Sequence, residues 1–208
     1  MHVDIWSDLV CPWCYLGKRR FERALSTFPG RDQVEVVHRS FQLDPSMPKG
    51  QSTRAREMLM RKYRMTEAQV VASQAQLEQL AAAEGLEYHL ADSHTGNTMD
   101  AHRLVHLGRE QGIQDAVIER LFHAHFTLNQ SLFDVESLAA LGIGAGLRDV
   151  DALLAGNRYE REVVADHQDA HALGARGVPF FVIDGRLGVS GAQAVDVFSS
   201  ALLRASGG

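Results

Sequence analysis

Residues 3–14 read VDIWSDLVCPWC and join a short apolar strand to a Cys-x-x-Cys pair. Cys11 and Cys14 are the only cysteines among the 208 residues. A Cys-x-x-Cys pair directly after a strand is typical of a redox site, because the two thiols can close a small disulfide ring and exchange two electrons. The pair therefore indicates thiol–disulfide chemistry.

Other uses of such a pair fit the sequence less well. A structural zinc site needs four ligands, and only the ten histidines could complete one here, so zinc stays an alternative and no metal is predicted. Covalent haem requires a histidine directly after the second cysteine, where this chain has Tyr15. A structural disulfide between neighbouring turns would restrict the unfolded chain little. Two unrelated buried thiols are the remaining alternative.

Length and composition fit one globular domain, or one domain with a large insertion. Apolar residues make up 45% and charged residues 23% of the chain, and the net charge of −5 argues against nucleic acid as the main partner. The basic segment 54–64 contains Glu57 and has a helical pattern, so we interpret it as a solvated helix face. No apolar run approaches the length of a membrane span, so no membrane partner is expected.

The first residues, MHVDIWSD, lack the basic segment, the apolar core and the cleavage site of a signal peptide. We therefore expect a cytoplasmic protein. In the cytoplasm a cysteine pair is more often catalytic or redox-sensing than a permanent crosslink.

Residue patterns predict the first elements. A strand is expected at His2–Ser7, where β-branched and aromatic residues lead into the cysteine pair. A helix follows from Pro12, which suits a first helical turn because its missing N–H needs no partner there, and Pro29-Gly30 ends it. A second strand is expected at Val34–Phe41, and Gln42–Gly50 is a connector with two prolines.

Residues from about 53 to 155 are expected to be all-helical, because glycine stops and Asx, Ser or Thr starts repeat at helix-length intervals. The strand pattern then returns. We expect a helix at Tyr159–Leu173, strands at Phe180–Ile183 and Leu187–Ser190 around the hairpin turn Asp184-Gly185, and a helix at Gln193–Leu203.

Together these elements predict an α/β protein with a thioredoxin-like fold (βαβαββα) and a large inserted all-helical domain. The thioredoxin-like domain comprises residues 1–50 and 156–208, and the inserted helical domain comprises residues 51–155. The first two strands are expected to pair in parallel through the intervening helix, and the last two to form an antiparallel hairpin.

Several short segments carry a family resemblance that spans nearly the whole chain. They are SDLVCPWCYLG at 7–17, FQLDP at 41–45, NT at 97–98, AHRL at 101–104, GVPFF at 177–181 and SGAQ at 190–193. With these the chain resembles the DsbA-like thioredoxin superfamily, and within it the FrnE-type cytoplasmic DsbA oxidoreductases. The related 2-hydroxychromene-2-carboxylate isomerases share the architecture, but they are expected to carry serine at the position of Cys11 and to use glutathione. Both cysteines are present here, which favours redox chemistry.

Cys11 is the predicted nucleophile. It lies at or just before a helix N-terminus, where unpaired N–H groups and the positive end of the helix dipole stabilise a thiolate. Cys14, about one turn further along, is predicted to be the resolving thiol that attacks the mixed disulfide. Both cysteines are therefore catalytic candidates.

Further residues are candidates around this pair. Pro12 and Trp13 are predicted to bind the substrate. Pro12 also stiffens the turn, and Trp13 adds apolar surface beside the sulfurs. For Trp13 the alternative is that the side chain only packs in the core. The resemblance implies that the Val178–Pro179 bond is cis, that Pro179 faces the disulfide as part of the catalytic set, and that the Val178 backbone pairs with an extended substrate. Asp8 could relay the proton of the resolving thiol, or it could cap a turn.

Two histidine pairs have the i, i+4 spacing that can hold a metal: His102 with His106, and His167 with His171. Neither pair lies in a His-Glu-x-x-His motif, so we interpret all four as core-edge or surface residues.

The leading hypothesis is a cytoplasmic thiol–disulfide oxidoreductase, extending to disulfide isomerase activity, that acts on protein or small-molecule thiols and disulfides. It needs no tightly bound cofactor, and glutathione or another thiol could be its reductant. The alternative is a glutathione-dependent isomerase or a tailoring enzyme of aromatic or polyketide metabolism. A third hypothesis is a redox-sensing module that forms the disulfide without turnover. No sequence feature indicates an oligomeric state.

Overall fold

The computed structural model describes residues 1–207, and the chain forms two compact units. Unit 1 consists of Met1–Leu43 together with the chain from Arg161 onward, and unit 2 consists of Asp44–Glu160. The sequence analysis places the corresponding breaks after residues 50 and 155. Both ends of the chain therefore contribute to unit 1.

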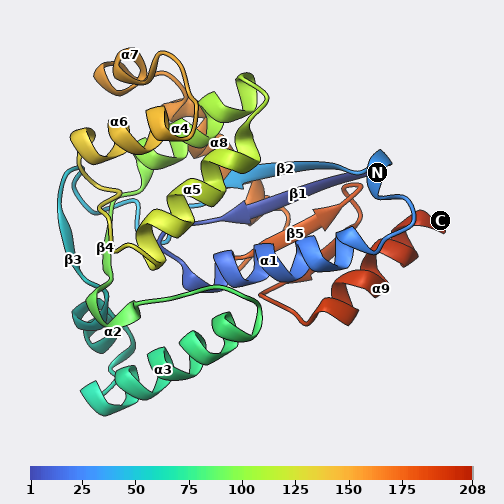
Figure 1. The fold of residues 1–208 in the computed structure, drawn as a ribbon, viewed down its shortest axis with the longest axis horizontal. Coiled ribbons are helices and arrows are strands. Elements are labelled where there is room, and N and C mark those ends of the chain that lie inside the picture. Colours follow the sequence, from blue (N-terminus) through green and yellow to red (C-terminus); the bar gives the residue numbers. More distant parts are fainter. Residues whose placement is uncertain (208) are drawn as a thin grey trace. The chain divides into compact units, whose positions relative to one another are not determined.

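Unit 1 is built on a four-stranded sheet (Figure 1). Its strands are β1 (His2–Ser7), β2 (Glu35–Ser40), β5 (Phe180–Ile183) and β6 (Leu187–Ser190), in the spatial order β2-β1-β5-β6. β1 pairs with β2 in parallel, and the hairpin of β5 and β6 is antiparallel, so both predicted pairings are confirmed. β5 also pairs with β1 in antiparallel orientation, which places two central strands side by side.

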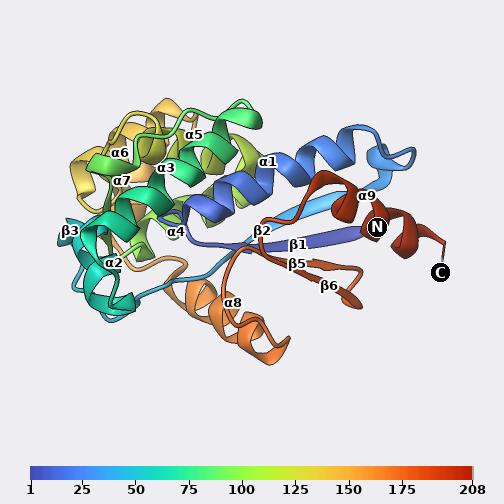
Figure 2. The ribbon, with the colours of Figure 1, turned by 90° about the horizontal axis from the view of Figure 1, so that it is seen from below.

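Helices cover both faces of this sheet (Figure 2). α1 (Pro12–Ser26) and α9 (Val195–Ser206) lie on one face, and α8 (Glu160–Ala172) lies on the other. The element order in unit 1 is thus β1-α1-β2-α8-β5-β6-α9, which is the predicted thioredoxin-like order.

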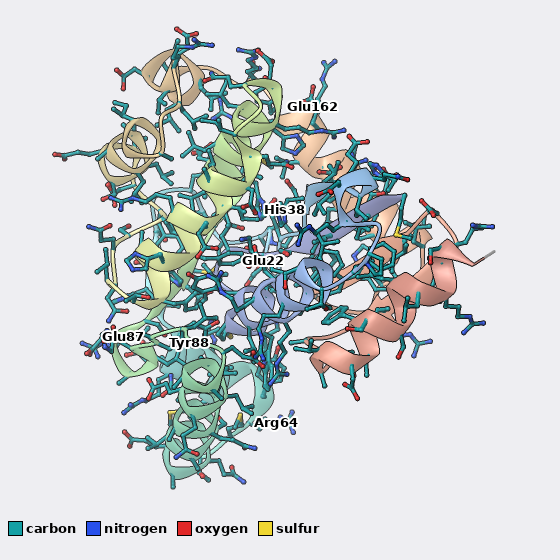
Figure 3. All side chains as sticks on the ribbon, turned by 45° about the vertical axis from the view of Figure 1, so that its right-hand side comes forward. Glu22, His38, Arg64, Glu87, Tyr88 and Glu162 are labelled. Carbon is teal, nitrogen blue, oxygen red and sulfur yellow. The ribbon has the colours of Figure 1, made fainter. Side chains whose placement is uncertain are left out.

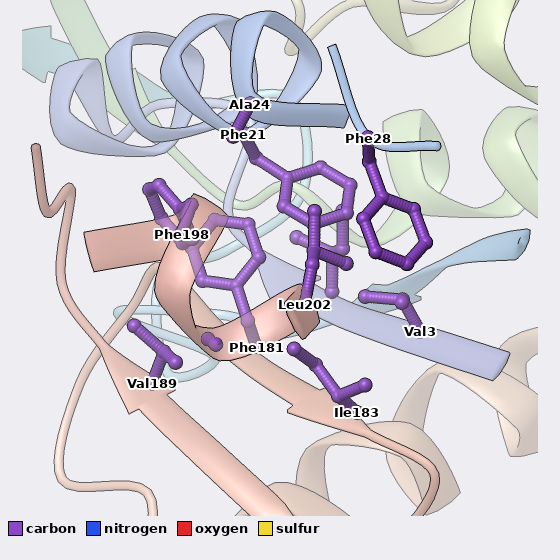
Figure 4. Packing of buried hydrophobic residues seen from close by; sticks show 11 residues of the cluster. Val3, Phe21, Ala24, Phe28, Phe181, Ile183, Val189, Phe198 and Leu202 are labelled. Carbon is purple, nitrogen blue, oxygen red and sulfur yellow. The ribbon is translucent and has the colours of Figure 1, made fainter. Parts of the chain in front are cut away.

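The alternating side chains of β5 explain why the sheet is covered on both faces. Phe181 and Ile183 point into the cluster under α1 and α9 (Figure 4), whereas Phe180 and Val182 belong to the cluster on the side of α8. All four side chains are buried. A strand that is apolar at every position can be stable only between two covering layers.

Three aromatic rings fix the packing of α1 and α9 on the sheet. The centroid of Phe181 lies 5.5 Å from that of Phe21 on α1 and 4.6 Å from that of Phe198 on α9. Phe21 and Phe198 meet edge to face at 5.7 Å. Rings at these separations add attraction beyond the apolar area that they bury.

Unit 2 consists mainly of helices. They are α2 (Ala55–Tyr63), α3 (Glu67–Ala83), α4 (Met99–Glu110), α5 (Gln114–Phe126), α6 (Val135–Gly144) and α7 (Val150–Ala155). Every residue of α4 from Ala101 to Gly108 is buried, so this helix forms the centre of the unit. Short 3-10 turns lie at Arg31–Gln33 in unit 1 and at Leu90–Asp92 in unit 2.

The prediction that residues 53–155 are all-helical is wrong in one detail. β3 (Ser52–Arg54) and β4 (His94–Gly96) form a two-stranded antiparallel ladder in unit 2. Each strand has three residues, and their sequences, STR and HTG, are too short and too polar to show the alternation that identifies a strand. No helix within residues 1–207 combines the length and the apolar character needed to cross a bilayer.

Candidate active site

The cysteine pair lies where β1 passes into α1. β1 ends at Ser7, and the backbone N–H of Cys11 donates to the carbonyl oxygen of Asp8 at 3.0 Å, which closes a tight turn. Cys11 is the N-cap residue of α1, and Pro12 occupies the first helical position as predicted. The turn therefore delivers Cys11 to the positive end of the helix dipole.

Cys11 is only 6% exposed and contacts the segment before β5. Its thiol donates to the carbonyl oxygen of Val178, with 3.7 Å between sulfur and oxygen. The structure thus brings together two predicted site residues that are 167 positions apart in the sequence.

Cys14 lies one turn further into α1 and has no exposed surface. Burial raises the pKa of its thiol well above the usual value, and the hydrogen bond and charge of Cys11 raise it further. The charge of Asp8 also raises this pKa, while a hydrogen bond with the Asp8 backbone opposes the shift. Cys14 is therefore a protonated thiol at neutral pH, as a buried resolving cysteine is expected to be.

Asp8 is the buried carboxylate beside this thiol. It is 1% exposed, and its Oδ2 accepts a hydrogen bond of 2.7 Å from the backbone N–H of Leu43. The carboxylate thus ties the turn after β1 to the segment that follows β2. Its interaction with Cys14 is compatible with the predicted relay of a proton, and that role stays a prediction.

The peptide bond between Val178 and Pro179 is cis, so this expectation is confirmed. Pro179 is buried, and its carbonyl oxygen accepts a hydrogen bond of 2.8 Å from the N–H of Gly191. Its ring packs against α1 at Gly17, where an added Cβ would lie 2.8 Å from the Pro179 Cγ.

The sequence analysis missed the role of Gly17. Glycine inside a helical pattern costs about 1 kcal/mol relative to alanine, so its presence there signals a packing constraint. The structure identifies that constraint as the close approach of the Pro179 ring. The other missed contact is the Leu43 N–H on Asp8, which no side-chain pattern could indicate.

The two predicted substrate-contacting residues in the motif differ in exposure. Pro12 is partly buried, whereas the Trp13 side chain is 44% exposed. An indole that remains so exposed contributes little to a core, which argues against the alternative that Trp13 serves plain packing.

The four histidines lie in two different units. His102 and His106 are buried on α4 of unit 2. On α8 the Nε2 atoms of His167 and His171 are 3.2 Å apart, and the His167 Nδ1 accepts from the N–H of Gln42 at 3.2 Å. Within residues 1–207 no group of three or more His, Cys, Asp or Glu side chains is placed to hold a metal ion.

Comparisons with known proteins agree with this fold. A family model described as a DSBA-like thioredoxin domain matches residues 2–203. A solved structure of a probable DsbA oxidoreductase from Streptomyces coelicolor is 49% identical, with a TM-score of 0.96, over 100% of this chain and 90% of that chain. A solved 2-hydroxychromene-2-carboxylate isomerase is 16% identical, with a TM-score of 0.72, over 98% of this chain and 95% of that chain. The uncharacterised protein YwbO of Bacillus subtilis is 27% identical over 97% of this chain and 96% of its own length.

Replacing Gly17 by alanine should displace the Pro179 ring. Overpacking costs about 1–3 kcal/mol and the better helix propensity of alanine returns about 1 kcal/mol, so we expect a net loss of about 1 kcal/mol in the free energy of unfolding. Urea unfolding measures it. Gly144→Ala is the matched control, because a Cβ at this helical glycine would meet nothing closer than 3.8 Å. Equal stabilisation by both variants would contradict the packing constraint.

The raised pKa of Cys14 predicts how the stability of the reduced protein depends on pH. Because the folded state holds this proton more tightly than the unfolded state, the contribution is fully present below the unfolded pKa of about 8.5 and is lost as the pH rises toward the folded value. Relative to Cys14→Ala, the free energy of unfolding of the reduced wild type should fall by up to about 1.4 kcal/mol per pH unit above pH 8.5. Parallel pH profiles from urea titrations would contradict this.

Proposed function

Since the chain belongs to the DsbA-like thioredoxin family, we propose that it is a thiol–disulfide oxidoreductase whose redox centre is the pair Cys11 and Cys14. The observation that carries the proposal is the position of Cys11. Cys11 is the N-cap residue of α1, and its sulfur interacts with the buried thiol of Cys14 and with the Val178 carbonyl oxygen.

The reaction needs two exchange steps. In the direction of substrate reduction, the Cys11 thiolate attacks one sulfur of the substrate disulfide, forms a mixed disulfide and releases the other sulfur as a thiolate. The Cys14 thiolate then attacks the Cys11 sulfur, closes the Cys11–Cys14 disulfide and releases the second substrate thiol. Two electrons pass to the substrate, and the reverse sequence oxidises a dithiol.

Cys14 must lose its proton before the second step. The thiol is buried and its pKa is raised, so a nearby base accelerates this step. The Asp8 carboxylate is buried next to Cys14, and we propose it as that proton acceptor.

The remaining site residues would bind the substrate. Trp13 offers an exposed indole between the two cysteines of the motif, and Pro12 fixes the first turn of α1. Pro179 belongs to the catalytic set, and the Val178 backbone would pair with an extended substrate segment, as in other cases of strand addition.

The physiological exchange partners are thiols and disulfides of proteins or small molecules, and not nucleic acid or membrane. The redox pair is made of protein side chains, so the reaction proceeds without a tightly bound cofactor. After substrate reduction, glutathione or another thiol would reduce the Cys11–Cys14 disulfide again. This step consumes two thiol molecules and forms one disulfide between them. Isomerase activity would follow when Cys11 attacks a substrate disulfide and another thiol of the same substrate then attacks the mixed disulfide. This second attack forms a new substrate disulfide and releases Cys11.

We also propose a cytoplasmic location. Only the pair at positions 11 and 14 can form a disulfide, and such a small ring suits the transient, catalytic disulfides of that compartment. Trapping with a membrane-permeant maleimide in intact cells should label Cys11, whereas an impermeant maleimide should leave it unlabelled.

The alternative activity is a small-molecule isomerase reaction that uses glutathione. The solved 2-hydroxychromene-2-carboxylate isomerase shares the fold of this chain at 16% identity. Cys11→Ser separates the two hypotheses, because isomerisation of a small molecule can survive loss of the thiol whereas disulfide exchange cannot.

Cys11→Ser should abolish turnover of glutathione disulfide, and Cys14→Ser should stop the reaction at a mixed disulfide on Cys11. Equilibration of the wild type in glutathione buffers, followed by thiol counting, gives the reduction potential. A value near about −120 mV assigns the protein to the oxidants and one near about −270 mV to the reductants. A pair that forms no reversible disulfide at any poise would contradict the proposal and leave the isomerase as the better one.

A further inference from the structure

Helix α2 is unusual because none of its nine residues is buried. Met58 and Leu59 are partly buried, whereas Met60 is 36% and Tyr63 is 58% exposed. Met60 and Tyr63 are three residues apart and therefore lie on one face of the helix. A helix in a folded unit normally buries its apolar side chains, so this face is left open.

The same stretch concentrates positive charge. Residues 54–64 contain five basic side chains and one acidic side chain, so in a chain of net charge −5 the other residues carry a net charge of −9. Arg54 and Arg56 have carboxylate partners at 3.8 Å and 3.2 Å. Arg61, Lys62 and Arg64 form no ion pair within residues 1–207, and all three are exposed.

The apolar and the basic side chains are neighbours. The Lys62 ammonium lies 5.9 Å from the ring centroid of Tyr63. Arg64, labelled in Figure 3, directly follows the helix and lies four residues from Met60. We call Met60, Arg61, Lys62, Tyr63 and Arg64 the α2 surface. The negative end of the helix dipole accounts for basic residues near the C-terminus of α2. It does not account for the exposed Met60 and Tyr63 beside them.

We propose that the α2 surface docks an acidic polypeptide segment that also carries apolar side chains, and that this segment belongs to the protein substrates of the redox centre. The identification of the segment as part of a redox substrate rests on the proposed function, whereas the binding of an acidic segment to the α2 surface does not. Charge complementarity selects the acidic segment, and the flexible thioether of methionine adapts to apolar side chains of different shapes.

The charge distribution favours a short peptide over an anionic bilayer. An anionic bilayer presents negative charge to a broad face of the molecule, and it would repel the residues outside 54–64, which carry a net charge of −9. A peptide meets only the α2 surface. In addition, α2 lacks the broad face of leucine, phenylalanine or tryptophan with which interfacial helices enter a membrane.

Fluorescence anisotropy with two labelled peptides tests the binding. The peptides share their apolar residues and carry either glutamate or lysine at all other positions, with serine in place of cysteine so that no redox step intervenes. The wild type should bind the glutamate peptide at least about tenfold more tightly than the lysine peptide, and added salt should weaken the preference.

The decisive variant is Arg61→Glu with Lys62→Glu, which should weaken binding of the glutamate peptide about tenfold. Its matched control, Arg186→Glu with Arg204→Glu, changes the net charge equally at two exposed positions of unit 1 and should bind as the wild type does. Arg61→Gln with Lys62→Gln should give an intermediate affinity, which guards against a helix that is destabilised by acidic residues near its C-terminus. Equal loss in both charge-reversed proteins would overturn the inference.

Kinetics then separates this inference from the proposed function. With a glutathionylated cysteine in the glutamate peptide, the decisive variant should raise KM and leave turnover of glutathione disulfide unchanged. If the wild type does not turn over glutathione disulfide, the proposed function is contradicted. The docking inference is unaffected, because the anisotropy result does not depend on turnover. Wild-type binding to vesicles of anionic lipid without a preference between the peptides would replace the docking proposal with a lipid site.

Discussion

β1 is hydrogen-bonded on both sides, and the positions of the site residues follow from that pairing. Its parallel partner β2 requires a crossover, which is α1, so a helix N-terminus must begin just beyond the end of β1. Its antiparallel partner β5 is held with Phe180 opposite Trp6, so the residues before β5 lie beside the residues after β1. The register between β1 and β5 therefore brings Cys11 and Val178 into contact.

Residue patterns predicted unit 1 well because each of its elements carries a local signal. β5 is a run of four buried apolar residues, and α1 begins at a proline that only a first helical turn accommodates. The register between β1 and β5 has no local signal, and neither has the hydrogen bond from the Leu43 N–H to Asp8, because a backbone donor is the same at every residue. The β3–β4 ladder was missed since its polar residues do not alternate with apolar ones.

The two cysteines place different demands on their surroundings. At neutral pH the buried Cys14 is a neutral thiol, because burial raises its pKa. Cys11 is the N-cap residue of α1, and its sulfur contacts the carbonyl oxygen of Val178. The two thiols thus have different surroundings, although they are only three residues apart in the sequence.

The insertion of unit 2 also affects the synthesis of the protein on the ribosome. β1, α1 and β2 emerge first, but the sheet lacks its second central strand until Phe180 has been added, 140 residues after Ser40. At about 5–20 residues per second this delay lasts about 7–28 s. During that time the nascent chain carries both thiols on an incomplete sheet, with one edge of β1 open to other chains. Until β5 pairs with β1, this edge is therefore open to aggregation and the two thiols are open to oxidation.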